Sequence, residues 1–158
     1  MAGQRIVPND LPGLIAAACP ETRGLYPGTG STPHSMGSDY GELLARCAQG
    51  LNFSRRSDVY LYSSDRLAHF VGNGILTHVE RATGYDRFFA DDELSFYETL
   101  DGFFENVRRH TADDDLRRRC AEKGWSAYHA LFGCEKVAAY IVDTVMERVE
   151  PTEACWSR

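Results

Sequence analysis

The sequence predicts an α/β fold in which a mostly parallel sheet is flanked by helices, and two observations carry this expectation. Two short apolar runs, Leu51–Phe53 and Ile75–Val79, each follow a stretch of helical periodicity and a glycine, as strands in such folds do. From Glu98 onward the pattern is helical over three further segments. Alternation of helix and strand is typical of parallel strands joined by crossover helices. We therefore expect the two runs to lie parallel in one sheet.

The amino-terminal third predicts fewer elements. Gly24–Tyr26 is a weak strand candidate, and a loop rich in proline and glycine follows it up to Ser38. A helix is expected over residues 39–48, with Gly50 as its stop signal. Its apolar face would consist of Tyr40, Leu43, Leu44 and Cys47.

The carboxyl-terminal half predicts helices with apolar faces. One face contains Leu100, Phe103, Phe104 and Val107, and the next contains Leu116, Cys120, Trp125 and Tyr128. The last helix, expected over Glu135–Arg148, carries a stripe made of Val137, Ala138, Ile141, Val142, Val145 and Val149. We expect this stripe to pack against the rest of the domain.

A chain of 158 residues has room for one compact domain with a core. We expect residues 1–38 to lead into the domain, residues 39–149 to form it, and residues 150–158 to be a loose tail. The formal net charge of −6 and the isoelectric point near 5.3 argue against a nucleic-acid partner. The clustered arginines near residues 55, 108 and 118 are interpreted as solvated helix faces.

The cysteines and the apolar runs place further bounds on the protein. There are five cysteines, an odd number, without a C-x-x-C pair and without histidines at zinc-ligand spacing. We expect reduced thiols, no metal and no cofactor. No apolar run reaches the length of a membrane span, and the first residues do not resemble a signal peptide. The prediction is a cytoplasmic protein without a membrane span.

Two loops have the position at which open α/β sheets bind ligands, beyond the carboxyl ends of the strands. The first contains Ser54 and Arg55, and the second contains Ser63 and Ser64 at the start of a short helix. A helix N-terminus offers unpaired N–H groups and a partial positive charge, so these serines could help to hold an anion such as a diphosphate. Alternatively, Ser64 or Asp65 only caps the helix.

Arg66 and His69 lie three residues apart on that short helix, on neighbouring positions of one face, so both could reach one ligand. The arginine would offer a charged fork to phosphate, and the histidine a hydrogen bond to a hydroxyl. The alternative for His69 is a partly buried imidazole with a structural partner. The turn Gly72–Gly74 would end the helix with left-handed geometry. The sequence has no G-x-G-x-x-G motif, no P-loop and no catalytic triad.

Five segments in order carry a resemblance to a known family. They are S-D-R-L-A-H-F-V-G-N-G-I-L-T, F-F-A-D-D-E-L-S-F-Y, L-D-G-F-F-E-N-V, D-D-D-L-R-R-R-C-A-E-K-G and the following W-S-A-Y-H. Over about Tyr40 to Asp143 the chain resembles the C-terminal, donor-binding part of GT-B glycosyltransferases of the group 1 type. More narrowly, it is similar to their spore-maturation CgeB-like branch. This resemblance implies a Rossmann-like domain, the C-terminal half of a GT-B fold.

The resemblance also implies roles for residues. Arg66 matches the family arginine and Gly74 the family glycine, so His69 stands where the family has a glutamate that binds the ribose hydroxyls. Histidine lacks the two-oxygen geometry of that glutamate. Glu93 matches an acidic residue that follows the donor loop, and a solvated acidic turn is its alternative.

The function implied is binding of a nucleotide diphosphate sugar and, together with an N-terminal Rossmann partner domain, transfer of its glycosyl group to an acceptor. The substrate-binding residues expected are Ser54, Arg55, Ser63, Ser64, Arg66, His69 and Glu93. Because the chain has room for only one half of such an enzyme, we expect little turnover from the isolated chain. The alternatives are a non-catalytic nucleotide-binding module and a protein-interaction module.

Overall fold

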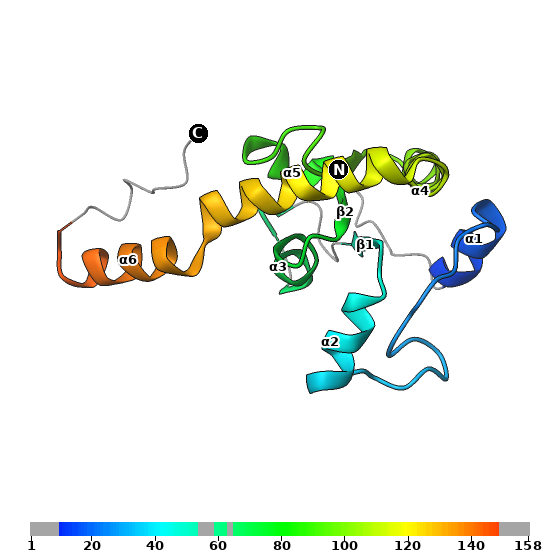
Figure 1. Ribbon diagram of the computed structural model, residues 1–158, viewed down its shortest axis with the longest axis horizontal. Coiled ribbons are helices and arrows are strands. Elements are labelled where there is room, and N and C mark those ends of the chain that lie inside the picture. The colour runs from blue at the N-terminus through cyan, green and yellow to red at the C-terminus, as the bar shows by residue number, and fades with distance from the viewer. Residues whose placement is uncertain (1–9, 54–58, 63–64, 149–158) are drawn as a thin grey trace.

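A three-stranded parallel sheet forms the centre of the computed structural model, which describes residues 10–53, 59–62 and 65–148 (Figure 1). The strands are β1 (Gln49–Asn52), β2 (Leu76–Glu80) and β3 (Ser95–Tyr97), in the order β1-β2-β3. Both neighbouring pairs are parallel. The predicted mixed α/β fold with a parallel sheet is therefore confirmed, as are the two strands expected from the sequence, each shifted by one or two residues.

Helices connect and cover these strands. They are α1 (Leu11–Ala18), α2 (Gly37–Ala45), α3 (Asp65–Gly72), α4 (Leu100–Ala112), α5 (Asp114–Phe132) and α6 (Cys134–Val145), with short 3₁₀ turns η1 (Arg81–Thr83) and η2 (Tyr85–Arg87). The helix start signals are visible at α4 and α5. Thr99 Oγ1 accepts from the backbone N–H of Gly102, and Asp113 Oδ1 accepts from that of Leu116.

The core of the described residues consists of two large clusters and a small third one of Leu76, Cys120 and Ala121. One cluster joins α3, α5 and the sheet through Leu67, Val71, Val79, Phe88, Phe89, Leu94, Ala127 and Leu131. The other joins α1, α4 and β3 through Ile15, Cys19, Tyr97, Phe103, Phe104 and Val107. Phe88 and Phe89 belong to the first of these clusters. The helices on both sides bury the sheet, which explains why every residue of β2 is buried.

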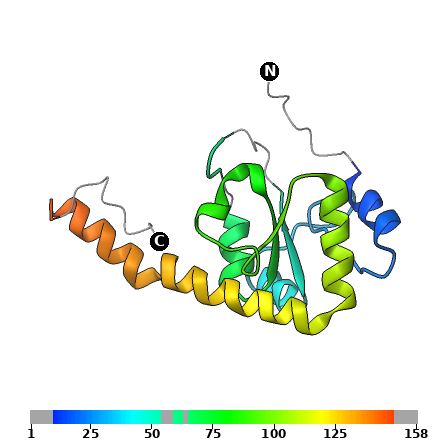
Figure 2. The same ribbon diagram turned by 90° about the horizontal axis from the view of Figure 1, so that it is seen from above.

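Helix α5 runs along the amino-terminal edge of the sheet, below the strands in the view of Figure 2. Near its start, Arg117 Nη1 donates to the carbonyl oxygen of Ala48, the residue before β1, at 3.3 Å. Near its end, His129 Nε2 lies 3.1 Å from the carbonyl oxygen of Gly72, where α3 finishes. Helix α5 therefore covers the edge at which the strands begin, and the strands end at the opposite edge.

Two expectations about the amino-terminal elements are wrong. Gly24–Tyr26 forms no strand. The first predicted helix ends at Ala45, so Gly50 does not stop it but lies inside β1. Gly50 is there because the ring of Phe70 packs over it, and a Cβ would lie 2.6 Å from Cδ2 of that ring.

The expectation that the last helix packs by its apolar stripe is also wrong. Helix α6 extends away from the sheet in both views (Figures 1 and 2), and none of its residues is buried. Val145 is 74% exposed and Ile141 is 55% exposed. Trp125, expected on the inner face of α5, is exposed because Gly124 takes the buried position. The predicted tail, 150–158, lies outside the described residues.

Candidate functional site

Each strand of the sheet ends in a buried polar residue. Asn52, Glu80 and Tyr97 are the last residues of β1, β2 and β3 and are exposed by 1%, 2% and 4%. Glu80 and Tyr97 are direct partners in the register of β2 and β3. In open parallel sheets, ligands bind beyond these carboxyl ends. Sequence reasoning missed this set, because Asn52 lies inside the expected strand Leu51–Phe53 instead of at its end, and no strand was predicted at β3.

Arg66 lies at this carboxyl edge. It is the second residue of α3, and its Nη2 donates to the carbonyl oxygen of Phe53 at 3.0 Å. Phe53 directly follows β1, so the hydrogen bond fixes the guanidinium beside the end of that strand. The Arg66 side chain is exposed there. Arg66 therefore lies at the edge of the sheet where the sequence predicted an anion-binding arginine.

His69 lies one turn further along α3 and faces α2. Its Nδ1 is 3.2 Å from the hydroxyl oxygen of Tyr40, and the two ring centroids are 5.3 Å apart. Burial, with the negative charge of Asp65 nearby, raises the pKa of Tyr40, so this hydroxyl stays protonated at neutral pH and can donate to the imidazole. Arg66 and His69 thus contact different neighbours, the end of β1 and helix α2.

Glu93 lies at the amino-terminal edge, opposite to Arg66. Its Oε2 accepts a hydrogen bond from the backbone N–H of Ala90 at 2.8 Å, which closes the turn before β3. The carbonyl oxygen of Glu93 packs against Gly124 of α5, where a Cβ would lie only 2.2 Å away. Beside it, the hydrogen bond and charge of Lys123 hold the pKa of Asp92 below its ordinary value.

The remaining predicted site residues, Ser54, Arg55, Ser63 and Ser64, lie outside the described residues. The loop 59–62 between them is described and reaches the carboxyl end of β2. The backbone N–H of Leu61 donates to the carbonyl oxygen of Thr83 at 2.8 Å, and the Tyr85 hydroxyl donates to that of Leu61 at 3.2 Å. This segment therefore belongs to the same edge as Arg66.

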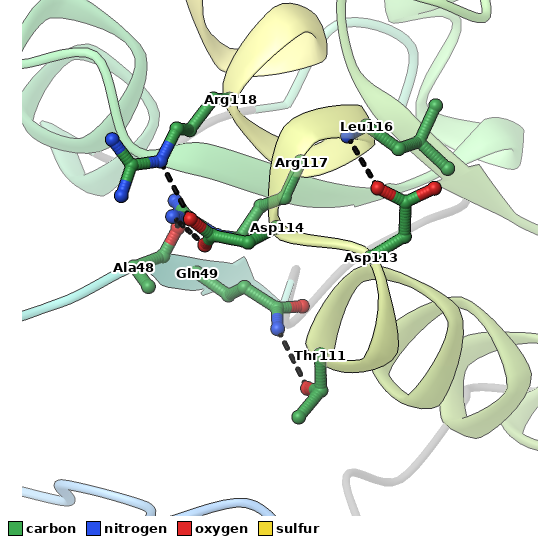
Figure 3. A network of polar contacts seen from close by, with 8 residues as sticks. All are labelled: Ala48, Gln49, Thr111, Asp113, Asp114, Leu116, Arg117 and Arg118. Carbon is green, nitrogen blue, oxygen red and sulfur yellow. Dashed lines mark hydrogen bonds and ion pairs between the residues drawn. The ribbon is translucent and has the colours of Figure 1, made fainter.

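The arginines at the start of α5 have structural partners, which Figure 3 shows. The carboxylate of Asp114 binds both Arg117 and Arg118, and these hydrogen bonds hold the pKa of Asp114 below its usual range. Arg117 also reaches Ala48, as described above. Arg108 donates to the carbonyl oxygen of Ala18 at 3.0 Å. These arginines therefore hold helices in place, whereas the sequence suggested only solvated helix faces.

Two open hollows lie beside α5. One, of about 660 Å³, is lined by Asp92, Glu93, Arg119, Glu122, Lys123, Ser126, Ala127 and Ala130. The other is lined by Asn73, Gly74, Arg117, Arg118, Ala121, Glu122 and Trp125. Both are at the amino-terminal edge, away from the strand ends. Lys123 and Asp92 of the first hollow form an ion pair, and Arg117 and Arg118 of the second both bind Asp114, so part of the charge there is already paired.

A row of polar side chains crosses the middle of the sheet. His78 of β2 lies between Gln49 of β1 and Ser95 of β3, at 2.8 and 2.9 Å. Burial, and to a smaller degree His110, lower the pKa of His78 to about 3. A neutral imidazole that is 1% exposed and bonded on both sides is a structural group.

The described part of the chain contains no cluster of three or more His, Cys, Asp or Glu residues that could hold a metal ion. Its four cysteines are free thiols, and Cys155 lies outside it. Burial raises the pKa of the Cys120 thiol to about 11, which makes it unreactive at neutral pH. Within the same residues, no helix has the length and apolar character needed to cross a bilayer.

The parallel sheet and its crossover helices define a Rossmann-like α/β domain. The model of the family described as glycosyl transferase-like matches residues 14–143. The chain therefore belongs to the glycosyl transferase-like family. No curated protein and no solved structure matches the sequence.

Proposed function

We propose that this chain binds a nucleotide diphosphate sugar at the carboxyl edge of its sheet, as the donor half of a GT-B glycosyltransferase of the group 1 type. The family membership supports glycosyl transfer in general terms. The observation that carries the proposal is the hydrogen bond from Arg66 to the carbonyl oxygen of Phe53, because it fixes a guanidinium at the end of β1 and in the first turn of α3.

The chemistry of this edge suits a leaving diphosphate. In glycosyl transfer from a nucleotide sugar, negative charge grows on the diphosphate as the glycosidic bond breaks. An arginine and the N–H groups of a helix start stabilise such charge without a proton transfer. In the proposal, Arg66 supplies the guanidinium. Ser54, Arg55, Ser63 and Ser64, in the adjoining segments, complete the anion site.

In this proposal His69 contacts the donor, whereas Glu93 does not. His69 takes the place of the ribose-binding glutamate, and it would bind one ribose hydroxyl after exchanging its contact with Tyr40. Glu93 was expected to contact the sugar, but it lies across the sheet from Arg66, so one donor would have to span the sheet to touch both. We therefore build the donor site on Arg66 and keep Glu93 outside it.

The proposal extends to the acceptor and the cellular setting. The acceptor, of unknown identity, would be held by an N-terminal Rossmann domain that closes over the carboxyl edge. For that reason we expect the isolated chain to transfer sugar far below the rates typical of enzymes, on the order of 1 to 10³ per second. Assignment to the CgeB-like branch and a cytoplasmic location are parts of the same proposal.

A non-catalytic nucleotide-binding module is the second candidate, and one observation favours it. The residue in the position of the ribose-binding glutamate is a histidine that is already bonded to Tyr40. Such a module would bind nucleotides weakly and transfer nothing, even when an N-terminal partner domain is supplied. Transfer in a reconstituted two-domain mixture separates the two candidates.

Calorimetric titration of the wild type and two variants with uridine and guanosine diphosphates tests donor binding. Arg66→Ala should weaken binding roughly tenfold to a hundredfold, the contribution of a charge-assisted hydrogen bond. Arg119→Ala, an exposed arginine of α5 at the other edge, is the matched control and should leave affinity unchanged. Thermal melts verify that both variants fold. Equal affinities of wild type and Arg66→Ala contradict the proposal.

A further inference from the structure

Helix α5 presents a tryptophan to the second of the two hollows beside it. Trp125 lines this hollow, which has a volume of about 380 Å³, and the residue is 45% exposed. Apart from Gly74 and Ala121, the other lining residues are polar or charged, namely Asn73, Arg117, Arg118 and Glu122. The hollow therefore combines one aromatic ring with groups that donate and accept hydrogen bonds.

Contacts on two sides hold the Trp125 ring in place. Its centroid lies 4.8 Å from that of His129, one turn further along α5, and His129 is bonded to the carbonyl oxygen of Gly72. Gly74 follows with φ of +72°, and a Cβ there would lie 3.9 Å from Cδ1 of the indole. Within the described residues the indole N–H makes no hydrogen bond, so it is available as a donor.

Polar side chains surround this ring. Arg118 and Glu122 precede Trp125 by two turns and one turn, so the three residues share one face of α5. Figure 3 shows Nε of Arg118 bonded to Asp114, and in the part of the chain that the structure describes neither Nη atom is bonded. Asn73 Nδ2 donates to a carbonyl oxygen of α3 at 2.7 Å, which fixes the amide and leaves its oxygen as an acceptor. The hollow thus offers donors and acceptors beside the ring.

The charges of the hollow favour a neutral ligand. Arg117 is engaged at all three nitrogens, by Asp114 and by the carbonyl oxygen of Ala48. In formal charge, Asp114 and Glu122 balance the two arginines. A phosphate group would compete with Asp114 for Arg118 and would meet the negative charge of Glu122. A neutral ligand with many hydroxyls encounters neither obstacle.

We propose that this hollow is an accessory carbohydrate site, in which a neutral pyranose stacks one face of its ring on Trp125. A pyranose has C–H groups on the faces of its ring and hydroxyls around its rim, so it suits an aromatic surface with polar neighbours. Glu122 and the amide oxygen of Asn73 accept from hydroxyls, and Arg118 donates to them. The site lies at the opposite edge of the sheet from Arg66. It therefore goes beyond the proposed donor site and does not depend on it.

NMR titration of the isotope-labelled protein with glucose, galactose, N-acetylglucosamine and maltose, each up to tens of millimolar, tests the site. Sorbitol, a polyol without a ring, is the control ligand. At least one sugar should shift the Gly74 amide and the Trp125 indole N–H, and sorbitol should not. Trp125→Ala should weaken the binding of that sugar roughly threefold to tenfold, the contribution of an aromatic contact. Trp125→Tyr retains an aromatic ring and should stay within about twofold of the wild type.

Two further variants separate the polar neighbours from a general effect, and thermal melts verify that all variants fold. Glu122→Ala removes a hydrogen-bond acceptor and should weaken the sugar roughly threefold to tenfold. Tyr60→Ala removes an aromatic side chain, 59% exposed, at the other edge and should leave the sugar affinity unchanged.

Four results would overturn the site. They are the absence of shifts at Gly74 and Trp125 with every sugar, equal shifts with sorbitol, unchanged sugar affinity in Trp125→Ala, and stronger shifts there with inorganic pyrophosphate than with any sugar. The last result would identify an anion site instead. None of the four affects the donor proposal, because that proposal is tested with uridine diphosphate and Arg66→Ala at the carboxyl edge.

Discussion

The imidazole of His78 bridges Gln49 and Ser95, with Nε2 2.8 Å from the Gln49 amide oxygen and Nδ1 2.9 Å from the Ser95 hydroxyl. An amide oxygen only accepts, so Nε2 carries the proton and Nδ1 accepts from the serine. Gln49 Nε2 donates in turn to Oγ1 of Thr111 at 2.9 Å (Figure 3). One continuous polar row therefore joins all three strands to α4 and fixes their register.

This row predicts a dependence of stability on pH. Burial lowers the pKa of His78 to about 3 and also lowers that of His110, so the unfolded chain binds protons near pH 6.5 that the folded chain does not. The contribution of the two neutral histidines to the free energy of unfolding is therefore fully present above about pH 6.5. It is lost as the pH falls toward the folded pKa, by up to about 1.4 kcal/mol per pH unit for each histidine.

Urea unfolding between about pH 7 and pH 5 measures this slope, and His78→Gln is the comparison variant. The exposed carboxylates Asp92 and Asp114 also have lowered pKa values, but the ordinary aspartate pKa of 3.8 places their effect below this range. The variant should show a shallower slope than the wild type. Identical slopes would mean that His78 is not held neutral by the fold.

Removal of the Ser95 hydroxyl from this row of polar side chains should destabilise the protein. Ser95→Ala leaves the buried Nδ1 of His78 without its donor, which costs about 1–3 kcal/mol in the free energy of unfolding. Ser38→Ala, at an exposed position of α2, should stay within about 0.5 kcal/mol of the wild type. Urea unfolding at neutral pH measures both changes, and equal values for the two variants would contradict the bridge.

Two helical glycines should respond to alanine in opposite directions. At Gly124 a Cβ would lie 2.2 Å from the carbonyl oxygen of Glu93, so Gly124→Ala forces α5 away from the turn before β3 and costs about 1–3 kcal/mol. At Gly41, in α2, a Cβ meets nothing within 4 Å, so Gly41→Ala should stabilise the protein by about 0.4–1 kcal/mol. Thermal melts of the two variants verify the signs, and a stable Gly124→Ala would refute the contact.

The apolar stripe of α6 should contribute little to the stability of the domain. Ile141 is 55% exposed, and Ile141→Ala should change the free energy of unfolding by less than about 0.5 kcal/mol. Leu94, exposed by 1%, belongs to the core, and Leu94→Ala should cost about 2–5 kcal/mol. A large loss of stability in Ile141→Ala would show that the stripe packs on the domain in solution.

The sequence predicts the sheet because local signals and packing agree in its strands. Both predicted strands are apolar runs of strand length, and both are found. The prediction for Gly50 is wrong because the local sequence does not distinguish a glycine that ends a helix from a glycine against which an aromatic ring packs. Only the position of Phe70 in the fold distinguishes the two cases. The stripe of α6 has a helical period, but periodicity does not reveal whether a partner surface faces it.

The candidate site is predictable only in part, for a related reason. Arg66 reaches the expected edge because a helix that follows a strand must begin at the carboxyl end of that strand. Glu93 precedes a strand instead, which places it at the other edge, and the resemblance alone does not show this.

A map of backbone amide shifts upon addition of uridine diphosphate to the isotope-labelled protein tests the central claim most directly. If the donor binds at the carboxyl edge, shifts are expected at Phe53, Arg66 and the segment from Glu80 to Gly84, and none around Gly74 and Trp125 at the amino-terminal edge. The Arg66→Ala variant should lose these shifts while its spectrum without ligand stays that of a folded protein. Shifts confined to Gly74, Trp125 and their neighbours on α5, or shifts that persist unchanged in Arg66→Ala, would contradict the account.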